Sequence, residues 1–237
     1  MSDLKGVKVK WYGHATVLVT TAHGTSILID PWFDGNPAYS KSSGVPKKVD
    51  LILCTHGHSD HVADAVRMAR EYEATVIAMV ELATWLGRHG AQKTVGMNLG
   101  GSYVFKDVTV SMVEAKHSTG MDDKEVGRLL YGGVASGFVV ESKDGDTVYH
   151  AGDTTVFGDM KLIGELYRPR LAMLPIGDHY TMGPRLAAHA ARLLGVEQVL
   201  PIHYGTFPQL RGTPEELVRE LGESSIKVRA IKPGETL

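Results

Sequence analysis

The sequence predicts a mixed α/β fold in which layered β-sheets are covered by helices. The chain opens with short strands, continues as alternating strands and helices, and then shows the same order again in its second half. No shift in composition marks a linker, no sequence repeat is visible, and 237 residues are enough for one domain with a large core. We therefore expect a single domain over residues 1–237, made of two architecturally similar halves with a break between about 115 and 133.

Alternation of apolar and polar residues predicts the first strands. Three short runs fit strands, at 7–12, 15–21 and 26–30. Turn residues at 22–25 join the last two runs, so we expect a β-meander. The next segment, 31–48, is rich in Pro, Gly and Ser and carries three aromatic residues. A long loop of this kind is typical of the border of a pocket.

The segment Thr55-His-Gly-His-Ser-Asp-His61 is the most informative stretch of the chain. It holds four side chains that bind divalent metals well: His56, His58, Asp60 and His61. Residues 49–54 before it fit a short buried strand, and residues 62–70 after it fit a helix. The segment therefore lies at the end of a sheet strand, where α/β folds place their ligands. We interpret it as a metal site rather than as a solvated surface loop.

The remaining elements follow from the same patterns. Strands are predicted at 75–79, 108–113, 137–142, 147–150, 171–176, 198–202 and 226–231, and helices at 81–89, 157–166, 184–194 and 214–221. Thr213-Pro-Glu-Glu216 has the form of a capping box with proline at the first helical position. Residues 118–133 are polar and glycine-bearing without a clear period, and they fit either a lid over the site or an ordinary surface insertion.

Three further ligand candidates stand just beyond apolar runs: His117, Asp153 and His203. A strand end holds a side chain rigidly, which suits a metal ligand. With the turn, these residues give five histidines and two aspartates, enough for two ions in nitrogen- and oxygen-rich coordination without sulfur. Such a set suits zinc, manganese, iron or nickel, and the residue list alone does not choose among them.

Composition argues against several classes of protein. Lys and Arg number 25 against 27 Asp and Glu, a formal charge of -2, so nothing indicates nucleic acid as a partner. The single cysteine, Cys54, rules out an internal disulfide and is expected to pack in a buried strand. No apolar signal region or membrane span is visible. We therefore expect a soluble cytoplasmic protein with no membrane partner.

The loop His56-x-His58-x-Asp60-His61, followed by His117, Gly152-Asp153-Thr154 and His203, closely resembles the metallo-β-lactamase superfamily over nearly the whole chain. Four other stretches are similar to the group of metal-dependent hydrolases that itself resembles the L-ascorbate-6-phosphate lactonases. They are Trp11-Tyr-Gly-His-Ala15, Ile29-Asp-Pro-Trp32, Tyr149-His-Ala-Gly-Asp-Thr154 and Leu174-Pro-Ile-Gly-Asp178. The resemblance implies a four-layer αβ/βα sandwich, with two central mixed β-sheets flanked by helices and metals at one edge between the sheets.

The resemblance also implies which residues bind which ion. His56, His58 and His117 would hold one divalent ion, Asp60, His61 and His203 would hold the other, and Asp153 would bridge them. Zinc or manganese is the expected metal, with iron or nickel as alternatives. The chain departs from the family at His179, where relatives often carry asparagine. His179 is therefore open to a role as a substrate contact, an extra ligand or a neutral replacement.

Two divalent ions that share a water lower its pKa from about 15.7 to near 7, so hydroxide forms at neutral pH. Asp60 is placed to orient that metal-bound hydroxide. His14 and His179 are candidates for an acid or a substrate-orienting group, with a structural histidine as the alternative for both. Asp30 is expected to support the ligands from behind, and His150 to make a structural hydrogen bond.

These residues and the resemblance predict a metal-dependent hydrolase whose small-molecule substrate is an ester, lactone or phosphorylated metabolite. The first alternative is a phosphodiesterase acting on nucleic acid or phospholipid, because Gly13-His14-Ala15-Thr16 and Asp30-Pro31 also resemble a phospholipase of the superfamily. The second alternative is a metal-binding or sensing protein without catalysis. The complete set of seven ligands argues against that reading. Members of the superfamily often assemble, so the resemblance also implies the possibility of a homo-oligomer.

Overall fold

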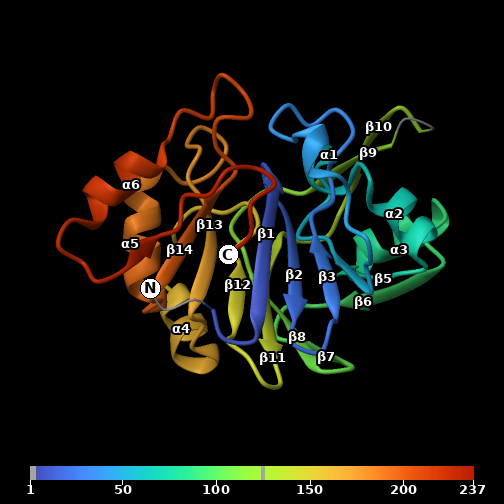
Figure 1. Cartoon of the computed structure of the whole chain (residues 1–237). Coiled ribbons are helices and arrows are strands. Elements are labelled where there is room, and N and C mark those ends of the chain that lie inside the picture. The colour runs from blue at the N-terminus through green and yellow to red at the C-terminus, as the bar shows by residue number, and fades with distance from the viewer. Residues whose placement is uncertain (1–3, 124–125) are drawn as a thin grey trace.

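Two β-sheets lie face to face in the computed structural model, which describes residues 4–123 and 126–237 (Figure 1). The first sheet has six strands in chain order, from β1 to β6. Their bounds are β1 (Val7–Gly13), β2 (Thr16–Thr21), β3 (Ser26–Ile29), β4 (Leu51–Leu53), β5 (Thr75–Met79) and β6 (Lys93–Met97). The strands pair antiparallel from β1 to β3 and parallel from β3 to β6. The β-meander expected at the start of the chain is confirmed.

The second sheet has seven strands in the order β15-β14-β13-β12-β11-β8-β7. Their bounds are β7 (Ser102–Phe105), β8 (Val108–Glu114), β11 (Ser136–Ser142), β12 (Val148–His150), β13 (Leu171–Pro175), β14 (Gln198–Ile202) and β15 (Lys227–Val228). Pairing is antiparallel from β7 to β12 and parallel from β12 to β15. The hairpin of β11 and β12, predicted from Asp-Gly at its turn, is confirmed.

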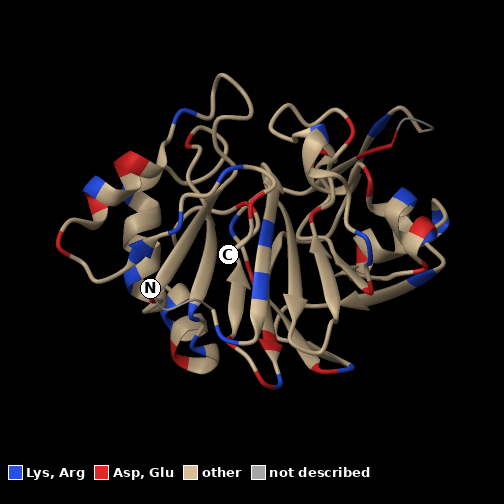
Figure 2. Ribbon diagram, in the orientation of Figure 1, with Lys and Arg blue, Asp and Glu red and all other residues tan. Residues whose placement is uncertain are grey.

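Helices cover the outer face of each sheet. Those beside the first sheet are α1 (Ser59–Val62), α2 (Ala65–Tyr72) and α3 (Val80–Arg88), and those beside the second are α4 (Met160–Tyr167), α5 (Pro184–Leu194) and α6 (Pro214–Leu221). Figure 1 shows the two groups on opposite sides of the pair of sheets, which is the predicted αβ/βα layering. Figure 2 shows residues of both charge signs interspersed along these helices. None of the described helices is both long and apolar enough to cross a membrane.

Alternation along each strand decides which core a side chain enters, because successive residues point to opposite faces of a sheet. In β3, Ile27 and Ile29 enter the core between the sheets, while Leu28 packs in the core under α2 and α3. In β11, Phe138 enters the core between the sheets and Val139 packs under the helices on the other side. The central core thus holds side chains from both sheets, and this packing fixes the sheet edges that carry the candidate ligands.

The chain changes sheet earlier than the predicted break at 115–133. Strand β6 closes the first sheet and β7 opens the second, so the crossing falls between Met97 and Ser102. The sequence does not predict β6 or β7, because both are edge strands whose residues are mostly exposed or half-buried and form no apolar run. The strand predicted at 226–231 is limited to Lys227–Val228.

Residues 118–133 contain a two-stranded hairpin beside the histidine-rich turn. Its strands are β9 (Gly120–Asp123) and β10 (Arg128–Tyr131), and residues 124–125 between them lie outside the described residues. Gly57 N donates to Thr119 Oγ1 at 2.9 Å, and the Met121 side chain is buried in the core under α2 and α3. The hairpin therefore packs against the turn, while its action as a lid stays a prediction.

Replacing Thr213 with alanine should lower the free energy of unfolding by about 1 kcal/mol. Thr213 Oγ1 accepts from Glu216 N at 3.2 Å, and Glu216 Oε2 accepts from Thr213 N at 3.1 Å, so the predicted capping box is confirmed. Urea denaturation measures the loss. Thr213→Ser keeps the hydroxyl and should retain most of the stability, and an equal loss in both variants would show that the cap does not stabilise α6.

Candidate metal centre

The seven predicted ligands come together at one edge of the two sheets. The turn from His56 to His61 follows β4 and runs into α1. His117, Asp153 and His203 follow β8, β12 and β14, all in the second sheet. His14, which follows β1, lies in the same cluster. Each sheet therefore supplies part of the centre.

A first group of three imidazoles consists of His56, His58 and His117. Their ligand atoms all lie within 4.8 Å of one another. Nε2 of His56 is 2.9 Å from Nδ1 of His58. Burial lowers the pKa of all three imidazoles. They are therefore neutral at pH 7, which leaves a ring nitrogen lone pair available to a metal.

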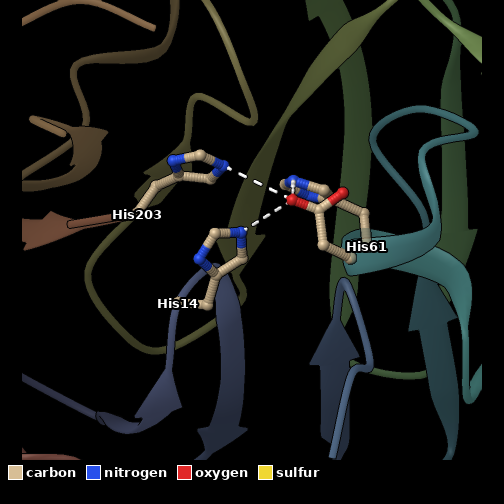
Figure 3. A group of neighbouring side chains, drawn as sticks. His14, His61 and His203 are labelled. Carbon is tan, nitrogen blue, oxygen red and sulfur yellow. Dashed lines mark hydrogen bonds and ion pairs between the residues drawn. The ribbon is translucent and has the colours of Figure 1, made fainter. Parts of the chain in front are cut away.

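A second group consists of His14, Asp60, His61 and His203, and its ligand atoms also lie within 4.8 Å of one another. Oδ2 of Asp60 is 3.0 Å from Nε2 of His14. The same oxygen is 3.8 Å from Nε2 of His61 and 3.8 Å from Nε2 of His203. In Figure 3, the labelled side chains of His14 and His203 come from different elements and point toward the same place.

Asp153 lies between the two groups. Its Oδ1 is 3.4 Å from Nε2 of His61, and its Oδ2 is 3.0 Å from Nε2 of His203. Oδ2 is also 3.6 Å from Nε2 of His117, which belongs to the first group. This buried carboxylate thus faces histidines of both groups, as a bridging ligand must.

Opposite charges dominate the second group. Burial alone would lower the pKa of the His203 imidazole, but the Asp153 carboxylate raises it to about 9. At His61 burial is likewise outweighed, because Asp153 and Asp30 raise its pKa well above the usual value. Burial opposes ionisation of Asp153, yet His203 and His61 hold its pKa well below its usual range. A divalent cation can replace these imidazole protons and supply the positive charge that pairs with the buried carboxylates.

Several buried atoms of the centre make no well-directed hydrogen bond within the part of the chain that the structure describes, although some of them lie at ion-pair distance from one another. They are Nε2 of His61, Oδ1 of Asp153 and both ring nitrogens of His203. Buried polar atoms in proteins are almost always paired, so four such atoms on three neighbouring residues are the mark of a cation site. The donors are nitrogen and oxygen without sulfur, a set that fits zinc or manganese.

The buried carboxylate of Asp30 accepts hydrogen bonds from the turn that carries His56 and His61, on the side away from the cavity. Asp30 Oδ2 accepts from Nδ1 of His61 at 2.7 Å. The same carboxylate accepts from Thr55 N at 2.8 Å and from Thr55 Oγ1 at 2.7 Å. Thr55 Oγ1 is in turn 3.0 Å from Nδ1 of His56. Bonds of this kind fix the ring orientation of metal-ligating histidines, so the geometry agrees with the supporting role expected for Asp30.

Two histidines outside the seven predicted ligands also lie at the centre, His150 beside it and His14 within its second group. His150 Nε2 donates to Ala15 O at 3.0 Å and its Nδ1 accepts from Gly152 N at 3.1 Å, the structural bonding expected for it. His14 is fully buried, and its carbonyl accepts from His203 N at 2.9 Å. Burial lowers the pKa of the His14 imidazole to about 4, so the ring is neutral at pH 7.

A cavity of about 540 Å³ opens onto the centre. Five candidate ligands line it: His58, Asp60, His117, Asp153 and His203. The other lining residues are Trp32, Ser59, Ser118, Tyr180, Phe207 and Gln209. Lys and Arg do not occur among the described residues that line it. The wall beyond the ligands is therefore aromatic and uncharged.

The cavity wall is only partly foreseen by the sequence. Trp32 belongs to the loop at 31–48, which was predicted to border a pocket. Phe207 and Gln209 were not predicted, and the one available signal is their position directly after the ligand-bearing end of β14. The Trp32 and Phe207 rings stack with their centroids 5.9 Å apart.

His179 is not brought into either group of ligands. Its side chain is exposed on the loop after β13, and its ring packs against Tyr180 with the centroids 4.4 Å apart. Tyr180 lines the cavity and His179 does not. The backbone at His179 has a φ of 55°, a left-handed conformation that asparagine tolerates well. A direct catalytic role for His179 stays a prediction.

Known proteins with similar sequences match this chain over nearly its whole length. Residues 25–204 match the family model described as the Beta-lactamase superfamily domain. A UPF0173 metal-dependent hydrolase of Koribacter versatilis is 49% identical over 234 residues, which is 99% of each chain. Another, from Rubrobacter xylanophilus, is 48% identical over 237 residues and covers 99% of this chain and 97% of its own.

Solved structures of other proteins have a similar fold. Igni18, described as a novel metallo hydrolase from the archaeon Ignicoccus hospitalis, is 36% identical with a TM-score of 0.85, covering 98% of this chain and 97% of its own. YhfI of Bacillus subtilis, a metallo-beta-lactamase fold protein, is 15% identical with a TM-score of 0.71, covering 98% and 99%. The chain therefore belongs to the UPF0173 family of metal-dependent hydrolases and has the metallo-β-lactamase fold.

Proposed function

We propose that this chain hydrolyses a small uncharged ester or lactone with the help of divalent metal ions. The observation that carries this proposal is the cavity above the candidate ligands. Its wall beyond the ligands consists of the aromatic residues Trp32, Phe207 and Tyr180 and the uncharged polar residues Ser59, Ser118 and Gln209, and Lys and Arg are absent from its described lining. A phosphorylated or anionic substrate would extend its charge into this uncharged wall, where no described residue pairs with it.

In this proposal the ions are zinc or manganese, and two groups of ligands hold them. His56, His58 and His117 hold one ion, and Asp60, His61 and His203 hold the other. Asp153 is shared, because it faces histidines of both groups. Such ions supply a water of lowered pKa and polarise the carbonyl oxygen of the substrate.

The chain's own residues orient the reactants. Asp60 lines the cavity, and despite its burial neighbouring histidines hold its pKa well below the usual range, so its carboxylate stays charged and would orient the attacking water by accepting a hydrogen bond from it. Trp32 and Phe207 form an apolar face for the acyl part of the substrate and exclude water beside the carbonyl. His14 does not line the cavity, so in this proposal it is not the acid that protonates the leaving group.

Three chromogenic substrates test the proposal on protein loaded with zinc or manganese. They are p-nitrophenyl butyrate, the singly charged mono-p-nitrophenyl glutarate, and bis(p-nitrophenyl) phosphate. We expect kcat/KM for the neutral ester to exceed that for the anionic ester by about tenfold, because none of the described residues in the wall beyond the ions is a Lys or Arg that could pair with the carboxylate at the far end of the acyl chain. Preference for the phosphodiester would favour the phosphodiesterase alternative. Absence of turnover with all three and with neutral lactones would favour a non-catalytic metal-binding protein.

Gln209→Lys should raise kcat/KM for the anionic ester about three- to fivefold and leave the neutral ester nearly unchanged. The new ammonium would stand at the exposed rim of the cavity, where an ion pair contributes up to about 1 kcal/mol. Gln92→Lys is the matched control, because Gln92 is exposed just before β6 and outside this cavity. An equal response of the two variants would place the substrate's charged end away from Gln209.

A further inference from the structure

We propose that His14 is a fourth protein ligand of the ion site formed by Asp60, His61 and His203. This inference rests on the proposed function only in requiring that the centre binds divalent ions. Its test therefore measures metal binding itself and needs no substrate.

The position of Nε2 is the first support. A ring nitrogen of His14 lies within 4.8 Å of a ligand atom of each of the other three residues, and Nε2 is 3.0 Å from Asp60 Oδ2. The His14 ring centroid is 3.9 Å from that of His203 and 5.6 Å from that of His61. Figure 3 shows the three labelled rings gathered around one point. A cation bound to Asp60, His61 and His203 would thus meet His14 as well.

The second support is the partner of the other ring nitrogen. Histidines that bind metals usually bond their second nitrogen to an oxygen, which fixes the tautomer and the ring plane. Nδ1 of His56 is 3.0 Å from the hydroxyl of Thr55. Nδ1 of His14 is 2.9 Å from the hydroxyl of Thr206, which is buried. His14 therefore repeats the arrangement of a predicted ligand, with a threonine behind the ring and Nε2 turned inward.

The third support is the rigidity of the position. His14 has a φ of 53°, a left-handed conformation that is uncommon for residues other than glycine and is often found at functional sites. Its carbonyl accepts from His203 N at 2.9 Å and from Trp11 Nε1 at 3.0 Å, which holds the backbone in place. The rings of Trp32 and Phe207 meet the imidazole edge-on at 5.1 and 5.7 Å. The ring is thus oriented before any ion binds.

A fourth ligand makes the two ion sites unequal. The second site would have His14, Asp60, His61 and His203, against His56, His58 and His117 at the first, with Asp153 shared. With Asp153 counted at both, the second site would have five protein ligands and the first four, so the second site would surround its ion more completely and the first would keep more room for water or substrate. The second site should therefore fill first, and the first site should exchange its ion more readily.

Titration of zinc into metal-free protein, in competition with a chelating indicator, tests the inference through the variant His14→Asn. Asparagine adopts the left-handed backbone readily but offers no imidazole. We expect the dissociation constant of the tighter step to rise by at least about tenfold, with little change in the weaker step. His179→Asn is the matched control, because His179 has a φ of 55° and an exposed side chain. It should change neither step.

Thr206 supplies a second route that leaves the imidazole in place. Thr206→Val removes the hydroxyl behind Nδ1 and should weaken the tighter step, whereas Thr206→Ser should not. A crystal structure of the zinc-loaded wild type should show His14 Nε2 about 2.0–2.1 Å from an ion. An unchanged tight step in His14→Asn, an equal loss at both steps, or an ion beyond bonding distance of Nε2 would overturn the inference. Wild-type protein that takes up no zinc would overturn the proposed function as well.

Discussion

Asp153→Asn is expected to reduce turnover by at least about 10²–10³-fold and to lower the amount of metal that survives dialysis. The carboxylate is buried and faces His61, His203 and His117 across both groups of ligands. An amide of nearly the same shape loses the negative charge that a shared ligand supplies, so both ions are held less tightly. Metal analysis after dialysis and kcat/KM for p-nitrophenyl butyrate measure the two effects.

Asp178→Asn is the control for this substitution, since Asp178 is exposed on the loop after β13. It should keep wild-type metal content and rate. Metal-free Asp153→Asn should melt at a lower temperature than the wild type, because the amide cannot form the buried ion pairs with His61 and His203, so metal content and rate are compared at a temperature where circular dichroism shows both proteins folded. If Asp153→Asn held two equivalents of metal and turned over at the wild-type rate, Asp153 would not be the shared ligand.

Asp30→Ala is expected to have the largest effect on stability, a loss of about 3–5 kcal/mol in the free energy of unfolding. The Asp30 carboxylate is completely buried and accepts hydrogen bonds from Thr55 N, Thr55 Oγ1 and His61 Nδ1. Truncation leaves all three donors without this acceptor in the interior. Zinc affinity should also fall by about 10–100-fold, because His61 loses the bond that orients it.

Urea denaturation in the presence of a chelator isolates the effect of Asp30 on folding from its effect on the metal. Asp30 has a φ of 48°, so part of the loss in Asp30→Ala comes from the backbone. Asp30→Asn tolerates that conformation and keeps one acceptor, and it should lose clearly less stability. Asp34→Ala, an exposed site in the same loop, should be near neutral. A loss below about 1 kcal/mol for Asp30→Ala would show that the hydrogen bonds of Asp30 do not support the turn.

The parts of the centre that the sequence predicts are those with local signals. His56, His58, Asp60 and His61 stand in one short turn, and its flanking strand and helix are visible in the pattern. Their spacing, together with the three later ligand candidates, identifies the superfamily and with it the layered fold. Strands that lie at sheet edges, such as β6, carry no comparable signal, because exposed positions do not need apolar residues.

The surroundings of His14 are not predictable in the same way. Its ring meets Asp60 and Thr206, which are 46 and 192 residues away in the sequence. These contacts exist only because the ends of β1 and β14 approach each other, where His203 N donates to His14 O. A pattern along the chain gives the end of a strand but not the neighbour that packing brings to it. The cavity wall at Phe207 escapes prediction for the same reason.

The bond between His14 O and His203 N joins the margin of one sheet to the margin of the other. Ions bound by residues of both sheets would link the same two edges a second time. They would bind only when the two sheets are packed together, because only then are the ligands of both sheets close to one another. Occupancy of the centre would then act on folding as well as on chemistry, because a ligand that binds only the assembled state shifts the equilibrium toward it. When metal is scarce, the protein would therefore lose its activity and also some of its free energy of unfolding, because the two sheets would separate more easily at this edge.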